Sequence, residues 1–225
     1  MTWFFKFLTS SVGKKLIMSL TGLFLIIFLV THLVGNFLLL SDDGGESFNL
    51  YAKFMTSNPL IKTVSYLLYT FIVLHAVQGI LIWRKNKASG GSTRYSGGRP
   101  QTTWAGRNMA GLGTVILIFI LIHMWQFWFQ YKWGEVATAT YDGVTVRNLY
   151  EVVDYTFQQW WFVVFYVFSM VMIAFHLQHG FQSAFQSLGL NHQKYTPLIN
   201  AVGTAYSILI PLGFAIIPVY MLLSN

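Results

Sequence analysis

The stretch LIMSLTGLFLIIFLVTHLVGNFLLL, residues 16–40, contains no Lys, Arg, Asp or Glu and decides the fold class. At 1.5 Å per residue, a helix of this length crosses a hydrocarbon core of about 30 Å. Four further runs without these residue types lie at 64–83, 109–131, 160–185 and 197–223. Because the backbone finds no water inside lipid, each run is expected to be helical. The sequence therefore predicts an all-α integral membrane protein, with five transmembrane helices bundled in one domain, residues 1–225.

The composition agrees with this class. Of the 225 residues, 55% are hydrophobic and only 9% are charged, whereas soluble domains carry about 25% charged residues. The chain has no Cys, which excludes disulfides, iron–sulfur clusters held by this chain, and covalently attached c-type haem. Pro211 and Pro218 interrupt the last run, where we expect a kink.

The charges predict the orientation. With a cytoplasmic N-terminus, ten of the 14 Lys and Arg residues lie on the inner side, as the positive-inside rule requires. All seven acidic residues then lie outside. The net charge of +7 therefore indicates a basic inner surface and not a nucleic-acid partner.

Two connecting segments have their own patterns. The inner loop KNKASGGSTRYSGGRPQTTWAG, residues 85–106, is basic and rich in Gly and Ser. We expect it to be mobile, or ordered only by a partner. In the outer loop 132–157, the segment NLYEVVDYTF is expected to form a short surface helix.

Histidines are the chemically informative residues of the spans. His192 lies in a loop, and the other five lie in the uncharged runs: His32, His75, His123, His176 and His179. A single membrane histidine often only bonds to a neighbouring helix, but intramembrane ionisable residues in four spans indicate function. No intramembrane carboxylate accompanies them, which disfavours an acidic proton relay. Neutral imidazole binds iron well, and two facing imidazoles can hold b-type haem without a thiolate.

Depth in the membrane sorts these histidines. From the inner boundary, His32 and His123 lie at roughly 26 and 24 Å, and His75 and His176 at roughly 14 and 16 Å. The sequence therefore predicts an outer pair, His32 with His123, and an inner pair, His75 with His176. Two haems would then stack about 10 Å apart in depth. His179, at roughly 12 Å, is not separated from His176 by depth. The shared pattern of HAVQG (75–79) and HLQHG (176–180) favours His176.

Over its whole length the chain resembles the single-chain, two-haem cytochrome b anchor of succinate dehydrogenases and fumarate reductases. The segments LTGLFLIIFLVTHLVGN (20–36) and FHLQHGFQSAFQSLG (175–189) are most similar to the Bacteroidetes-type variant. The resemblance implies a subunit of respiratory complex II, which serves the tricarboxylic acid cycle, in the bacterial cytoplasmic membrane. A flavoprotein and an iron–sulfur protein would bind its inner face. Electrons would pass between the iron–sulfur protein and a quinone, commonly menaquinone, through two haems b. The subunit would react with quinone and would not bind succinate.

The resemblance also implies roles for single residues. Relatives often carry His-x-x-Asn-Gly in the fourth helix, which makes His176 the ligand and places His179 where the asparagine stands. His179 would then contact a haem propionate or a neighbouring helix. Ser19 resembles a propionate contact, and Arg107 and Lys14 either pair with propionates or anchor helix ends.

The quinone site is implied near the outer haem. Three acidic residues follow the first span on that side, and one of them would exchange protons with the quinone unless all three simply belong to a solvated loop: Asp42, Asp43 and Glu46.

Two other functions fit the spans. One is the cytochrome b subunit of another respiratory oxidoreductase, of the hydrogenase or nitrate reductase type, which co-purifying subunits would distinguish. The other is a cofactor-free transporter or channel, which would lack b-type absorption bands.

Overall fold

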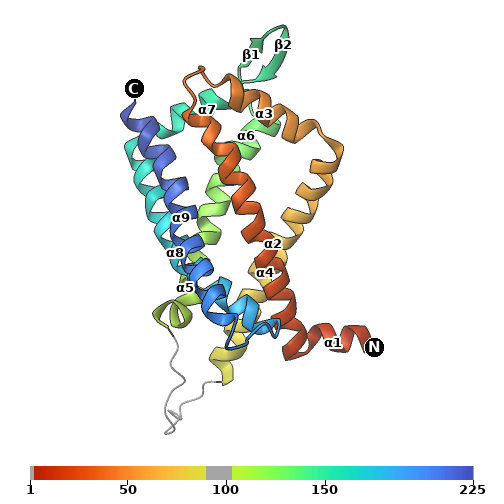
Figure 1. The fold of residues 1–225 in the computed structure, drawn as a ribbon. Coiled ribbons are helices and arrows are strands. Elements are labelled where there is room, and N and C mark those ends of the chain that lie inside the picture. Colours follow the sequence, from red (N-terminus) through yellow and green to blue (C-terminus); the bar gives the residue numbers. More distant parts are fainter. Residues whose placement is uncertain (1–2, 90–102, 225) are drawn as a thin grey trace.

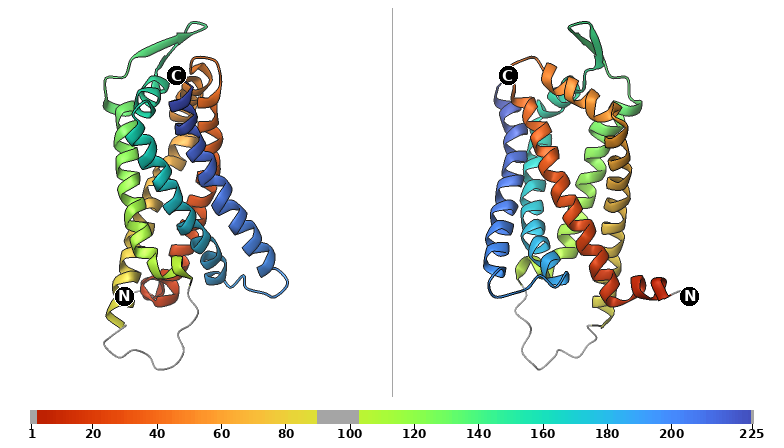
Figure 2. Two further views of the ribbon diagram at one scale, coloured as in Figure 1. Left: turned by 90° about the vertical axis from the view of Figure 1, so that its left-hand side faces the viewer. Right: turned by 45° about the vertical axis from the view of Figure 1, so that its right-hand side comes forward.

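The computed structural model describes residues 3–89 and 103–224 of the chain. Five helices in it are long and apolar enough to cross a membrane, and their arrangement as one bundle is seen in Figures 1 and 2. This confirms the five predicted spans as far as helix length and composition define them. The spans cover Ser11–Leu40, Pro59–Ala88, Trp104–Trp133, Trp160–Ser187 and Thr196–Leu223.

The elements follow one another in a simple up-and-down order. They are α1 (Trp3–Thr9), α2 (Ser11–Asn36), η1 (Phe37–Leu40), α3 (Glu46–Ser57), α4 (Pro59–Ser89), α5 (Trp104–His123), η2 (Met124–Phe129), α6 (Gln130–Trp133), β1 (Thr138–Tyr141), β2 (Val144–Arg147), α7 (Leu149–Phe157), α8 (Trp160–Ser187) and α9 (Thr196–Leu223).

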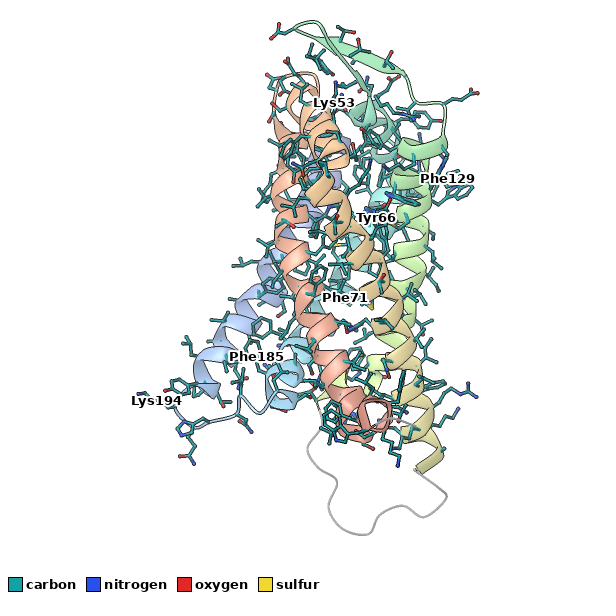
Figure 3. The ribbon with its side chains drawn as sticks, turned by 90° about the vertical axis from the view of Figure 1, so that its right-hand side faces the viewer. Lys53, Tyr66, Phe71, Phe129, Phe185 and Lys194 are labelled. Atoms are coloured by element: carbon teal, nitrogen blue, oxygen red, sulfur yellow. The ribbon has the colours of Figure 1, made fainter. Side chains whose placement is uncertain are left out.

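The two ends of the bundle differ in charge. One end carries α3, the β-hairpin and α7, and the other carries α1 and the turn between α8 and α9 (Figure 1). Figure 3 shows Lys53 near the first end and Lys194 at the second. We call the first the acidic end, because all seven acidic residues lie in its segments: Asp42, Asp43, Glu46, Glu135, Asp142, Glu151 and Asp154. We call the other the basic end, since it carries Lys14, Lys15, Arg84, Lys85, Lys87 and Arg107.

Each helix extends past the uncharged run that predicts it. α4 begins at Pro59, where the side-chain oxygen of Asn58 accepts hydrogen bonds from the backbone of Leu60 and Ile61 at 2.9 and 3.3 Å. Proline suits this first position because its missing N–H would have no helical partner. At its other end α4 continues to Ser89, so the first residues of the predicted loop 85–106 are helical. Residues 90–102 of that loop lie outside the described part of the chain.

Helix α8 is central to the packing. It contacts α2, α5 and α9, and α2 also packs against α4. Small residues allow close approach between membrane helices. Gly213 of α9 is an example, because a Cβ there would lie 2.8 Å from a methyl carbon of Leu33 on α2. α9 runs as a single helix through the buried Pro211 and Pro218.

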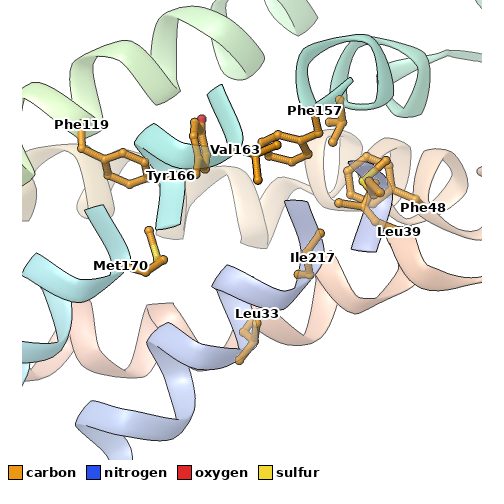
Figure 4. Close-up of a cluster of buried hydrophobic side chains, with 11 residues drawn as sticks. Leu33, Leu39, Phe48, Phe119, Phe157, Val163, Tyr166, Met170 and Ile217 are labelled. Atoms are coloured by element: carbon orange, nitrogen blue, oxygen red, sulfur yellow. The ribbon is translucent and has the colours of Figure 1, made fainter. Parts of the chain in front are cut away.

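The hydrophobic core lies toward the acidic end (Figure 4). It joins residues of the spans to residues of α3 and α7: Leu33, Leu39, Phe48, Phe119, Val153, Phe157, Val163, Tyr166, Met170, Ile217 and Met221. The basic end lacks a comparable cluster among the residues that the structure describes.

A cap covers the acidic end, made of α3, the β-hairpin and α7. The predicted surface helix in NLYEVVDYTF is present as α7, whereas α3 and the hairpin are additions to the predicted fold. Asp142 and Gly143 form the hairpin turn, both with positive φ, a turn that Asp-Gly sequences favour. Asn49 of α3 is fully buried and holds the cap together. Its amide nitrogen donates to the Tyr141 hydroxyl at 3.0 Å and to the Asn148 side-chain oxygen at 2.8 Å.

Candidate functional site

Two histidine pairs lie inside the bundle, one nearer each end. Nearer the acidic end, His32 of α2 faces His123, the last residue of α5, with ring centres 5.8 Å apart and planes at 88°. Four phenylalanines surround this pair at ring-centre distances of 5.2–5.7 Å: Phe28 and Phe214 around His32, and Phe119 and Phe127 around His123. The helix takes a π-helical form directly after His123, over Met124–Phe129. Such turns are frequent at functional sites.

The second pair joins α4 to α8. His75 and His176 have ring centres 6.2 Å apart and planes at 66°. Gly22 of α2 leaves room for the His75 ring, since a Cβ there would lie 3.2 Å from Cε1 of His75. Gly180 follows His176 by four residues, and a Cβ there would meet nothing within 4 Å. The structure thus brings together the same two pairs of histidines that the depth calculation predicts.

The distance between the pairs can be measured along two helices. Thr21 contacts His75, and His32 lies eleven residues further along α2, which is a rise of roughly 16 Å. Tyr166 contacts His123, and His176 lies ten residues further along α8, a rise of roughly 15 Å. Both values exceed the predicted separation of about 10 Å. The prediction measured depth from the assumed inner boundaries Lys15, Arg84, Arg107 and Ser187. The first three spanning helices extend past these positions by different lengths, whereas α8 ends at Ser187.

Neighbouring hydroxyl groups contact Nδ1 of two of the four rings, His123 and His75. The Tyr166 hydroxyl lies 3.1 Å from Nδ1 of His123, and the Thr21 hydroxyl lies 3.2 Å from Nδ1 of His75. Metal-binding histidines usually bond to a second protein group through the nitrogen that does not bind the metal. These contacts therefore suit ligation through Nε2.

The remaining two rings differ in this respect. Nδ1 of His32 lies 3.3 Å from the amide nitrogen of Asn36, which donates to the His32 carbonyl oxygen at 2.7 Å. Nδ1 of His176 is buried and has no hydrogen-bond partner among the described residues. Buried polar atoms usually have a partner, so His176 is the least satisfied of the four rings.

The spacing of the rings suits metal binding. An imidazole nitrogen binds a first-row metal ion such as Zn²⁺ at about 2.0–2.1 Å, so two imidazoles on opposite sides of one ion have ring centres roughly 6 Å apart. The observed distances of 5.8 and 6.2 Å fit one ion per pair. Within the described ranges, no group of three or more His, Cys, Asp or Glu residues could hold a metal ion. Each pair thus offers two ligands, and a planar group such as haem would have to supply the others.

His179 is not part of either pair. Its Nδ1 lies 3.5 Å from the hydroxyl of Thr103, which caps the start of α5. A Cβ at Gly106 would lie 2.8 Å from Cε1 of His179. His179 therefore contacts the start of the neighbouring helix α5.

The other predicted cofactor contacts lie toward the basic end. Ser19 is buried two residues before Thr21, and its hydroxyl donates to the Lys15 carbonyl oxygen at 2.9 Å. Lys14 is partly buried and Arg107 is exposed. Neither of these two cations has a side-chain hydrogen bond or ion pair within residues 3–89 and 103–224, so both are available to an anionic group.

The three acidic candidates do not have equal surroundings. Asp43 accepts hydrogen bonds from the backbone of Gly45 and Ser47, both at 3.0 Å, at the start of α3. Hydrogen bonding by Ser47 lowers the pKa of Asp43, so this carboxyl is poorly suited to holding a proton. Asp42 is exposed, and Glu46 is the partly buried first residue of α3.

Sequence reasoning missed the partners of the histidines. Thr21 carried a usable signal, since it precedes His32 by eleven residues, about three helical turns, and therefore shares its face of α2. Tyr166 carried no such signal, because a tyrosine in an apolar run is common. Its distance from His123 depends on how α5 and α8 are rotated against each other. Comparison of the chain with protein-family models, with curated proteins and with solved structures finds no match.

Proposed function

We propose that this chain is the membrane anchor and two-haem cytochrome b of a succinate:quinone oxidoreductase. The observation that carries the proposal is the presence of two imidazole pairs at two depths of the bundle, each with the spacing of a two-ligand iron site. In this proposal His32 and His123 bind the iron of one haem b, and His75 and His176 bind the iron of the other. Each bound haem would act as a one-electron carrier.

Residues around the pairs prepare them for this role. Tyr166 and Thr21 orient the rings of His123 and His75 through Nδ1, and outer contacts of this kind tune a metal site as well as position it. The phenylalanines around His32 and His123 exclude water. Exclusion of water favours neutral imidazole, which is the form that binds a metal.

The charge distribution supports one orientation of the chain in the membrane. We place the basic end in the cytoplasm, following the positive-inside rule, and the whole chain in the bacterial cytoplasmic membrane. An iron–sulfur subunit, carrying the flavoprotein subunit, would dock at the basic end. Lys14, Ser19 and Arg107 would face the propionates of the haem between His75 and His176, because all three lie on the basic side of that pair.

The quinone, which we propose to be menaquinone, would react at the acidic end beside His32 and His123. Asp42 and Glu46 are the carboxyl groups proposed to exchange protons with it. The low pKa of Asp43 and its role at the start of α3 make it the weakest of the three candidates.

The test is isolation of the complex in mild detergent through a tag on this chain. Covalent or bound flavin, iron–sulfur clusters and succinate-dependent reduction of a naphthoquinone should accompany the chain. Co-purification with a hydrogenase or nitrate reductase subunit would show that the chain serves a different oxidoreductase. A chain that is isolated alone and without pigment would overturn the proposal.

A further inference from the structure

Tyr51 of α3 lies directly on Gly35 of α2. A Cβ at Gly35 would lie 2.8 Å from the Tyr51 hydroxyl oxygen and would also overlap the ring, so no larger residue fits at position 35 without moving the phenol. Gly35 itself is buried. The absence of a side chain at this position therefore sets where the Tyr51 hydroxyl lies.

The hydroxyl lies against a residue that neighbours His32 on α2. Gly35 follows His32 by three residues on α2, so the two positions are neighbours on one helix face, separated by about 4.5 Å of rise. On the outer side of α2, Val34 and Phe37 are 63% and 43% exposed and face the surroundings of the bundle. Lipid-facing positions of α2 therefore adjoin the buried position 35.

The Tyr51 hydroxyl is available as a donor. It has no hydrogen-bond partner within the part of the chain that the structure describes, whereas the hydroxyls of three other tyrosines are engaged: Tyr131 with Thr56, Tyr141 with Asn49 and Tyr166 with His123. Burial raises the pKa of Tyr51, so the phenol keeps its proton. A half-buried phenol without a partner is suited to donate to a ketone oxygen.

We infer that Tyr51 donates a hydrogen bond to a carbonyl oxygen of the quinone bound between α2 and α3, beside His32 and His123. The inference rests on the proposed function, because that function supplies the quinone. It adds a binding residue for the quinone ring to the acidic groups considered above. No proton transfer is required of Tyr51.

The test compares two conservative variants in the complete isolated complex. Tyr51→Phe removes the hydroxyl and keeps the ring. Tyr155→Phe is the matched control, because Tyr155 lies at the same end, is 71% exposed, and lines a different cleft of about 570 Å³ beside α7. Binding of a short-chain naphthoquinone is measured by equilibrium titration, together with haem content and succinate oxidation by an artificial dye.

Loss of one hydrogen bond should weaken naphthoquinone binding roughly 3- to 10-fold in Tyr51→Phe. Haem content and dye reduction should stay at the wild-type level, and Tyr155→Phe should bind as the wild type does. Gly35→Ala, which displaces the ring but keeps the hydroxyl, should also weaken binding.

Unchanged binding in Tyr51→Phe would overturn the inference. Weaker binding in Tyr155→Phe alone would place the quinone in the cleft beside α7 instead. Both results differ from failure of the proposed function, in which the wild-type complex itself would contain no haem or bind no naphthoquinone.

Discussion

Tyr166→Phe is the substitution that tests the site in most detail. Tyr166 is only 5% exposed, and its hydroxyl lies 3.1 Å from Nδ1 of His123. The variant keeps the ring in the core but leaves a buried imidazole nitrogen without its partner, which costs about 1–3 kcal/mol. Loss of such an outer contact typically lowers metal affinity 10- to 100-fold, and about 1.4 kcal/mol corresponds to a factor of ten. The free-energy cost of the lost contact and the expected loss of metal affinity are therefore of similar size.

The assay is a redox titration followed at the b-type absorption bands, with haem quantified per chain. One spectral component should shift in potential or lose occupancy, and the other should titrate as in the wild type. Tyr206→Phe is the control, since the Tyr206 hydroxyl donates to the Ile26 carbonyl oxygen and not to a histidine. If Tyr166→Phe leaves both components unchanged, or affects the component that His75→Ala removes, then His123 is not held by Tyr166 as a ligand of the first haem.

Three further predictions follow from the site. His75→Ala and His176→Ala should remove the same haem and His32→Ala the other, as judged by difference spectra; loss of a common component in His75→Ala and His32→Ala would show that the pairing is wrong. His179→Asn should retain both haems by quantitative haem analysis, because His179 contacts the start of α5 and neither pair; a missing haem would make it a ligand. Glu46→Gln should slow quinone turnover while haem content and dye-linked succinate oxidation persist, and normal turnover would remove Glu46 from the quinone site.

Much of the architecture depends on features that a sequence displays directly. A run such as residues 16–40 without charge predicts a span, because the thickness of the hydrocarbon core fixes the length of helix needed. The pairs His32–His123 and His75–His176 could be predicted as neighbours because depth grows linearly with residue number in a helix. The cap was only partly predictable, since Asn49 acts through partners about 90 to 100 residues away.

Contacts across helices were the part that sequence did not predict. The distance between Tyr166 and His123, or between Tyr51 and Gly35, depends on how each helix is rotated and tilted against its neighbour. Depth alone carries no information on rotation. The same limit applies to His179, whose contact with Thr103 depends on where α5 begins beside α8.

Haem content tests most directly whether each histidine pair holds one haem b. The chain, extracted in mild detergent, is examined by reduced-minus-oxidised difference spectroscopy, and its extractable haem is quantified against protein. We predict b-type bands and two haems per chain, one for each pair of imidazoles. A chain without b-type bands, or with a single haem that survives both His32→Ala and His75→Ala, would contradict it.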